Sequence, residues 1–164
     1  MKTIILFRHG EAGWEIDSHR DKGRKLTITG IQEAKKMGQY LARQNHVPDM
    51  VISSIAIRAK MTAAFAMESG KWDCSYKIEE GIYGGGPLFL LDLVKSQDNK
   101  LSSICLVGHE PNFSKFIAYL TDSARAYFPT ASMAKVDLNV KGWVDIAPGF
   151  GEIDWLIYPE ALVS

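Results

Sequence analysis

The sequence predicts a three-layer α/β/α sandwich with a mostly parallel central sheet. Its 164 residues suit a single domain spanning 1–164. Apolar residues make up 46% of the chain, enough to cover both faces of a sheet. Continuous apolar runs, which are typical of parallel strands buried on both faces, alternate with segments of helical periodicity. The regular alternation of the two patterns favours the α/β class.

Five strands are predicted. Three are nearly continuous apolar runs, namely 2–8, 49–54 and 103–108. Two segments, 133–140 and 152–158, alternate only in part, which favours half-exposed edge strands. The glycines at 149–151 suggest that these two form a hairpin. The parallel strands are expected to be joined by right-handed crossovers through helices.

Four helices are predicted between the strands. They cover about 29–45, 56–68, 88–97 and 111–121. Thr29 and Gln32 have the spacing of a capping box at the start of the first helix. Pro111 suits the first turn of the fourth. The chain shows no internal repeat or linker, so one continuous fold is expected.

The overall composition limits the class of partner. With 19 Lys and Arg against 19 Asp and Glu, the formal net charge is zero, which favours neither nucleic acid nor a membrane as the partner. The apolar stretch behind Met1 is too short for a signal peptide, and no segment could span a bilayer. Of the two cysteines, Cys105 lies in an apolar strand and is expected to be a reduced core thiol. A cytoplasmic location is expected.

Two histidine-containing segments follow predicted buried strands. Residues 8–10 read Arg-His-Gly, and residues 108–112 read Gly-His-Glu-Pro-Asn. Ligands of an open parallel sheet bind outside the carboxyl ends of its strands. If the two strands are neighbours, His9 and His109 enter one crevice with Arg8 beside them, a combination that suits a phosphoryl group. A helix is expected after each histidine, and the N-terminal amides of the helix directly behind His109 would favour an anion.

Two further residues extend this phosphate hypothesis. Gly10 would let backbone amides approach a ligand closely. Arg58 follows the second predicted strand in the first turns of an Ala-rich helix, from which its guanidinium could bind phosphate oxygens. Taken singly, each feature also fits a structural role, as a loop tripeptide, a capping histidine or a solvated helix arginine. Their combination predicts a phosphate site.

Together these segments resemble the histidine phosphatase superfamily, which has the phosphoglycerate-mutase-like fold. Residues 54–62 match its middle motif, although Ile55 stands where the family usually has proline. Residues 21–30 and 107–112 are similar to stretches of SixA-type phosphohistidine phosphatases, with Lys25 in place of a proline. Residues 59–108 must hold the rest of a helix, a strand, a loop and another helix. Only a minimal cap is therefore expected, over an open pocket.

The resemblance implies a metal-independent phosphatase without a cofactor, in which His9 attacks phosphorus and becomes transiently phosphorylated. Arg8, Arg58 and His109, together with Gly10, would hold the phosphoryl oxygens. The implied substrate is a phosphorylated protein carrying phosphohistidine. A small-molecule phosphomonoesterase of the same superfamily remains an alternative. A mutase, which needs a closed pocket, and a non-catalytic phosphoprotein-binding module, which need not retain both histidines, are less favoured.

The general acid is the least defined part of the implied site. In the family, a carboxylate after the middle motif protonates the leaving group. Glu80 is the first choice, with Glu79 and Glu11 as alternatives, and each would otherwise be a solvated surface carboxylate. A phosphohistidine substrate relaxes this need, because imidazole titrates near pH ~6.5 and can leave neutral when its other nitrogen is protonated. The polar stretch 15–25, including His19, would line the pocket rim or form a solvated loop.

Overall fold

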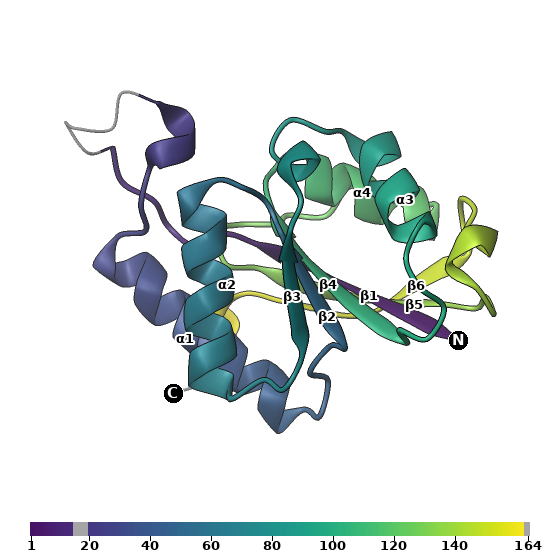
Figure 1. The fold of residues 1–164 in the computed structure, drawn as a ribbon, viewed down its shortest axis with the longest axis horizontal. Coiled ribbons are helices and arrows are strands. Elements are labelled where there is room, and N and C mark those ends of the chain that lie inside the picture. Colours follow the sequence, from purple (N-terminus) through teal and green to yellow (C-terminus); the bar gives the residue numbers. More distant parts are fainter. Residues whose placement is uncertain (15–19, 163–164) are drawn as a thin grey trace.

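The computed structural model describes residues 1–14 and 20–162. Its central feature is a six-stranded sheet with the order β3-β2-β4-β1-β5-β6 (Figure 1). The strands are β1 (Lys2–Arg8), β2 (Met50–Ser53), β3 (Ser75–Ile78), β4 (Ser103–Gly108), β5 (Met133–Leu138) and β6 (Gly151–Ile157). The helices are α1 (Ile28–Arg43), α2 (Ile57–Gly70), α3 (Pro87–Lys95) and α4 (Asn112–Thr121). All predicted strands and helices are present, with ends that shift by a few residues.

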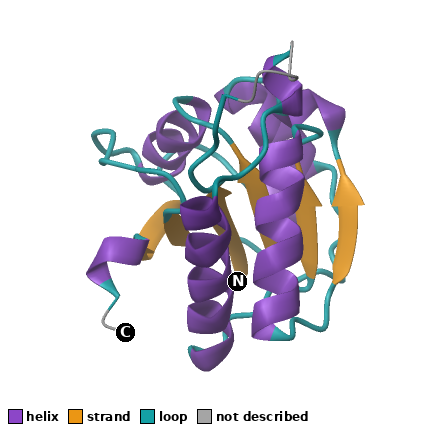
Figure 2. Ribbon diagram, turned by 90° about the vertical axis from the view of Figure 1, so that its left-hand side faces the viewer, coloured by secondary structure: helices purple, strands orange, loops and turns teal. Residues whose placement is uncertain are grey.

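Two helices cover each face of the sheet, which confirms the predicted three-layer sandwich. The alternation of side chains along β1 shows why. Ile4 and Leu6 join one core cluster with α3 and α4, whereas Ile5 and Phe7 join the other with α1 and α2. Figure 2 shows α1 and α2 lying side by side in front of the strands. Because both faces of β1 are buried, its sequence is a continuous apolar run rather than an alternating one.

The two sides of the sheet differ in how their strands pair. β3, β2, β4 and β1 pair in parallel, whereas β5 runs in the opposite direction and pairs antiparallel with both β1 and β6. The prediction that both β5 and β6 are edge strands is wrong for β5, which pairs with β1 on one side and β6 on the other. β5 and β6 do pair, but their connection contains the 3-10 helix η3 (Trp143–Asp145) and is not a tight turn.

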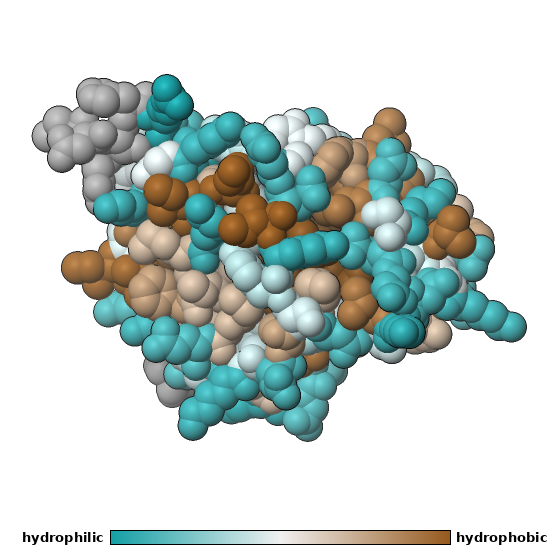
Figure 3. Space-filling view, viewed as in Figure 1, coloured by the Kyte–Doolittle hydropathy of each residue, from teal (hydrophilic) through white to brown (hydrophobic). Residues whose placement is uncertain are grey.

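β3 forms the other edge of the sheet. All four of its residues are exposed, including Tyr76 at 40% and Ile78 at 46%. Figure 3 shows hydrophobic side chains gathered on the face of the molecule that is turned to the viewer in Figure 1. Because β3 is short, it offers only a short edge for pairing with another chain. This strand and the following α3 occupy the segment between α2 and β4, so the described chain has no large cap there.

The start of α1 differs from the predicted capping box. The helix begins at Ile28, and its N-cap is Thr27, whose hydroxyl accepts a hydrogen bond from Gly30 N at 3.0 Å. The same hydroxyl donates to Glu11 Oε1 at 3.0 Å. A Cβ atom on Gly30 would lie only 2.1 Å from Glu11 O, so the loop after β1 packs directly on this helix end. This tertiary contact, absent from local patterns, explains why Thr29 is not the cap.

Replacing Gly38 by alanine should lower the free energy of unfolding by about 1–3 kcal/mol, the usual cost of overpacking. A Cβ atom there would lie 2.2 Å from the backbone oxygen of Ala66, at the contact between α1 and α2. The gain of at most about 1 kcal/mol in helix propensity does not offset this clash. Urea denaturation measures the change. Gly84→Ala is the matched control, since nothing lies within 4 Å of its Cβ position; equal stability of both variants would contradict the prediction.

The remaining expectations from composition concern cysteines and membranes. Cys105 is fully buried in β4 and Cys74 is half-buried, and both are free thiols. Burial raises the pKa of the Cys105 thiol, so this side chain stays protonated in the core. Within the described residues, every helix is too short or too polar to cross a membrane.

Candidate active site

Three neighbouring strands bring polar side chains to the same edge of the sheet. β1 and β4 are adjacent and parallel, with Arg8 opposite Gly108, and β2 lies on the other side of β4. His9, Ser54 and His109 each follow directly on one of these strands. The ring centroids of the two histidines lie 5.3 Å apart. The strands are therefore neighbours, as the sequence predicts, and the two imidazoles lie together at this edge of the sheet near Arg8 and Arg58. We call this cluster of four side chains the crevice.

The hydrogen bonds of His9 define its tautomer. Nδ1 lies 2.7 Å from the carbonyl oxygen of Gly10, which can only accept, so Nδ1 carries the proton. Nε2 lies 3.3 Å from Arg58 Nε, which can only donate, so Nε2 presents a lone pair. The side chain is buried, with 8% exposure. This arrangement leaves the unprotonated nitrogen of a neutral imidazole fixed at the strand end.

Both pocket histidines are held neutral. Burial is the main cause that lowers the pKa of His9 to about 3, and the positive charges of Arg58 and Arg8 lower it further. Burial also lowers the pKa of His109 to about 4, again with help from the two arginines. At neutral pH the crevice therefore holds two uncharged imidazoles beside two guanidinium groups.

The free energy of unfolding should fall as the pH drops from about 6.5 to about 4. In that window unfolded histidines bind protons, whereas His9 and His109, with pKa values of about 3 and about 4, do not. More protons on the unfolded chain mean that stability rises with pH, by up to about 1.4 kcal/mol per pH unit for each histidine. Urea titrations across this range measure the slope. The double variant His9→Gln and His109→Gln should flatten it, and an unchanged slope would show that other groups cause it.

Arg58 connects His9 to Asp21, which lies in the polar stretch 15–25 that the sequence offered as a pocket rim or a solvated loop. It lies in the first turn of α2 and is buried, with 5% exposure. Besides the Nε contact to His9, its Nη1 donates to Asp21 O at 2.8 Å and its Nη2 to Asp21 Oδ2 at 2.9 Å. All three nitrogen atoms of the guanidinium thus donate a hydrogen bond. Arg58 converges on the histidines as predicted, and it also fixes the position of Asp21.

Asp21 and Tyr83 are the two pocket residues that sequence patterns missed. Tyr83 OH donates to Asp21 Oδ2 at 2.5 Å, and the Tyr83 ring meets the His109 ring edge-on at 5.5 Å. Arg24 Nη1 donates to Asp21 Oδ1 at 3.2 Å. The Tyr83 hydrogen bond, followed by those from the arginines, lowers the pKa of Asp21 to about 2. Asp21 opens the SixA-like stretch of the sequence, but no local signal marks Tyr83.

Two buried nitrogen atoms in the crevice are unpaired within the described residues, Arg8 Nε and His109 Nδ1. Arg8 Nη1 donates to the carbonyl oxygen of Phe128 at 3.0 Å, which fixes the guanidinium in place. His109 Nε2 lies 2.8 Å from Ser54 Oγ. When the Ser54 hydroxyl donates in this contact, His109 Nδ1 carries the proton. Both unpaired nitrogens are then N–H donors, and their chemistry fits the oxygens of an anion.

Gly10 has a clear packing role. Its amide donates to Thr62 Oγ1 at 3.0 Å, and a Cβ atom on it would lie 2.7 Å from Gly30 O. Glycine is therefore needed for the loop to pack against the start of α1. Contact between Gly10 and a phosphate stays a prediction.

The candidate acids are close in the chain to residues of the crevice or to Tyr83. Glu80 is exposed at the start of η2 (Glu80–Ile82), three positions before Tyr83. Glu79 accepts a hydrogen bond from the amide of Gly81 at 3.4 Å. Glu11 is exposed and bonded to the N-cap hydroxyl of α1. Which of them acts as the acid stays a prediction. His19 lies outside the described residues.

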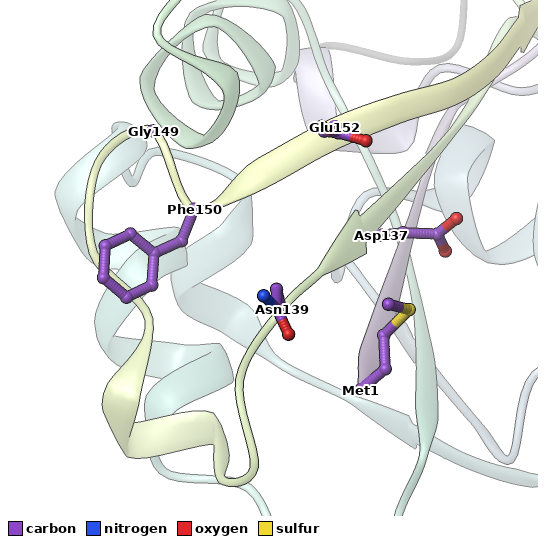
Figure 4. A pocket seen from close by; sticks show the side chains of 6 residues that line it. All are labelled: Met1, Asp137, Asn139, Gly149, Phe150 and Glu152. Carbon is purple, nitrogen blue, oxygen red and sulfur yellow. The ribbon is translucent and has the colours of Figure 1, made fainter.

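Other parts of the described surface look less suited to phosphate. A hollow of about 510 Å³ lies near the amino end of β1, opposite the histidines, and is lined by Met1, Asp137, Asn139, Gly149, Phe150 and Glu152 (Figure 4). Its two carboxylates would repel a phosphate dianion. Among the described residues, no three His, Cys, Asp or Glu side chains are grouped so that they could hold a metal ion.

Several known proteins are similar to this chain in sequence and fold. Residues 4–83 match the model of the histidine phosphatase superfamily (branch 1). An uncharacterised protein of Mycobacterium tuberculosis is 31% identical over 153 residues, covering 87% of this chain and 92% of that protein. A phosphohistidine phosphatase SixA homologue of Haemophilus influenzae is 31% identical over 132 residues, which cover 72% of this chain and 76% of that protein.

The structural likeness extends over nearly the whole chain. A SixA structure from Nakamurella multipartitia superposes with a TM-score of 0.83 at 25% identity, covering 98% of this chain and 97% of the other. The crevice lies at the carboxyl ends of β1 and β4, where the two histidine segments meet. The chain belongs to the histidine phosphatase superfamily, branch 1, and lies in its SixA-like group.

Proposed function

We propose that this protein is a metal-independent phosphatase that removes the phosphoryl group from phosphohistidine in a protein, by way of a phosphorylated His9. The observation that carries the proposal is the neutral His9 imidazole, whose Nε2 lone pair is held 3.3 Å from Arg58 Nε in a cationic crevice. A nucleophile and the cations that would bind the phosphoryl group thus lie together at the carboxyl edge of the sheet. The SixA homologue of Haemophilus influenzae is named for the same reaction.

The first chemical step is an in-line displacement. His9 Nε2 donates its electron pair to phosphorus, and the bond from phosphorus to the leaving nitrogen breaks, with its electron pair passing to that nitrogen. The proton on His9 Nδ1 remains bonded to the Gly10 carbonyl, which orients the ring. In the second step, water attacks phosphorus and His9 departs. The products are inorganic phosphate and the free enzyme.

The cations of the crevice would take the place of a metal ion. Phosphoryl transfer is catalysed chiefly by positioning and by balancing the charge on the equatorial oxygens. Arg8 Nε and His109 Nδ1, both buried and unpaired in the described structure, would donate to those oxygens. When the Nε2 lone pair of His9 bonds to phosphorus, it no longer accepts from Arg58 Nε, and this N–H would donate to a phosphoryl oxygen instead. The Arg8 and His109 donors are already in place and need no reorganisation when the transition state forms.

The short connection between α2 and β4 supports a protein-borne substrate. It contains β3, η2 and α3, and the buried face of α3 packs in the core with β1 and β4. Little of this connection is therefore left to form a lid over the crevice. A phosphorylated side chain on a protein surface can reach an uncapped crevice.

A substrate panel tests this proposal. The protein is assayed with a phosphohistidine peptide, phosphoramidate, p-nitrophenyl phosphate and sugar phosphates, each with and without EDTA. Phosphohistidine should give the highest kcat/KM, and EDTA should have no effect. Higher kcat/KM on sugar phosphates would identify a small-molecule phosphomonoesterase instead. Activity that EDTA removes and a divalent ion restores would contradict the mechanism.

Replacing Glu80 by glutamine should slow phosphomonoester hydrolysis by about 10²–10⁴-fold, the usual contribution of a positioned acid. Phosphohistidine hydrolysis should slow far less, because a protonated imidazole leaves as a neutral group. The measurement is kcat for an alkyl phosphate and for a phosphohistidine peptide. Glu68→Gln, at an exposed position on α2, is the matched control. If neither reaction slows, Glu79 or Glu11 becomes the candidate; equal slowing would assign Glu80 to phosphate positioning.

A further inference from the structure

A carboxylate stands beside the phosphoryl crevice. Asp21 is held by three elements: Arg58 of α2 and Tyr83 after η2 bind Oδ2, and Arg24 after η1 (Asp21–Gly23) binds Oδ1. Its side chain is still 41% exposed. A carboxylate offers about four lone-pair positions, and the bonds from the described residues use three. Within that part of the chain, one acceptor position remains for a further partner.

The position of Asp21 relative to the nucleophile is fixed by a single planar group. The Arg58 guanidinium contacts His9 Nε2 with Nε at 3.3 Å and Asp21 Oδ2 with Nη2 at 2.9 Å. A phosphoryl group on His9 and the group leaving from it would thus lie next to this carboxylate. For a phosphate dianion alone, an adjacent negative charge is unfavourable. The negative charge of Asp21 becomes favourable if the leaving group carries a positive charge.

Phosphohistidine is a substrate whose leaving group carries such a charge. When its distal ring nitrogen is protonated, the phosphorylated ring is an imidazolium with one exposed N–H donor. We propose that Asp21 accepts a hydrogen bond from this N–H and thereby selects phosphohistidine over phosphomonoesters. The inference rests on the proposed function and names the residue that determines its substrate class. The proton stays on the distal nitrogen throughout, and the P–N electron pair passes to the proximal nitrogen, so a neutral imidazole departs.

Asp21 acts here as an acceptor and not as an acid. The groups that bond to or act on it from the surrounding elements are Arg58, Tyr83, Arg24 and His109, and Lys22 lies 5.0 Å from the Tyr83 ring centroid. With its pKa lowered to about 2, chiefly by the Tyr83 hydrogen bond, the carboxylate has no proton to give at neutral pH.

The benefit of Asp21 should depend on pH in a defined direction. An anion within reach raises the pKa of a bound imidazolium by about 1–3 units, so the substrate stays protonated at higher pH. Below the pKa of the free substrate, near pH ~6.5 for an ordinary imidazole, protonation needs no help. His9 and His109 do not titrate near that pH, since their pKa values are about 3 and about 4. The substrate is thus the imidazole that titrates there.

Asp21→Asn tests the inference, with kcat/KM measured for a phosphohistidine peptide and for p-nitrophenyl phosphate. At about pH 8, the ratio of the two kcat/KM values should fall tenfold or more, the effect of one pKa unit or more. At about pH 5.5 the ratio should recover towards that of the unmodified protein. Asp73→Asn, at an exposed position before β3, is the matched control for loss of one charge.

The outcomes separate this inference from the proposed function. If the unmodified protein hydrolyses phosphohistidine but Asp21→Asn slows both substrates equally at both pH values, Asp21 only braces Arg58 and the inference is wrong. If the unmodified protein acts on p-nitrophenyl phosphate and not on phosphohistidine, the proposed function fails and the inference with it. Circular dichroism checks folding, and Asp21→Ser, which also lacks the charge, should reproduce the pH-dependent loss. A loss seen in only one of the two variants would overturn the assignment.

Discussion

His9→Ala should abolish turnover, with a loss in kcat on the order of 10⁴-fold or more, as expected when a covalent nucleophile is removed. No other side chain in the described crevice presents an unprotonated nitrogen in the same place, because His9 Nε2 is fixed by Arg58 and by the Gly10 carbonyl at Nδ1. Rapid quench with labelled substrate should detect an acid-labile phosphoenzyme in the unmodified protein and none in the variant. The cavity left by the imidazole should still bind phosphate weakly, because both arginines remain.

The control for this prediction is the histidine that packs away from the crevice. His46 stacks on Trp155 with ring centroids 6.0 Å apart, and Trp155 Nε1 donates to its Nδ1 at 3.3 Å. His46→Gln should retain turnover and phosphoenzyme formation. Persistence of the phosphoenzyme in His9→Ala would transfer the role of nucleophile to His109, and the covalent mechanism would have to be redrawn around that residue.

The strands of the sheet could be predicted because a strand that is buried on both faces has a continuous apolar sequence. Residues 4–7 of β1 are fully buried on both faces, so every position is apolar and the strand is visible as a run. The place of β5 could not be predicted, because an alternating strand is compatible with an edge or with one polar face inside a sheet. Its pairing with β1 is a contact between segments far apart in the chain.

The two histidines differ in their distance from the helix that follows. α4 begins at Asn112, close behind His109, whereas α1 begins at Ile28, near the predicted start of the first helix. The 3-10 helix η1 lies between His9 and α1 and brings Asp21 to Arg58. The contacts of Asp21 with Arg58 and Tyr83 join segments far apart in the chain, so the sequence around Asp21 does not encode them alone.

The predicted crevice residues share one property that made them visible. Arg8, His9 and His109 each stand at the end of a buried strand, where a polar residue after an apolar run is conspicuous. Tyr83 has no such context, since it follows a short 3-10 helix and is aromatic like many core residues. Its role emerges only from the contacts of its hydroxyl with Asp21 and of its ring with His109.

Arg58→Lys should lower kcat/KM by about 10²–10³-fold, the usual cost of removing one donor from a preorganised anion site. Lysine keeps the positive charge but has a single flexible ammonium group, which cannot reproduce a planar fork. The guanidinium of Arg58 bonds in three directions, to His9 and to two atoms of Asp21, at 2.8–3.3 Å. The substitution thus removes the alignment of the nucleophile while preserving the charge. Steady-state kinetics with a phosphohistidine peptide measures the effect.

The loss should appear mainly in kcat, since the charge that attracts the phosphate remains and the geometry needed in the transition state does not. Arg43→Lys, at an exposed position in the last turn of α1, is the matched control and should leave both constants unchanged. A rise in KM with kcat unchanged would mean that Arg58 only binds the substrate. In that case the contact between Arg58 and His9 would have no part in orienting the nucleophile, and Arg8 and His109 would have to supply the stabilisation of the transferred phosphoryl group.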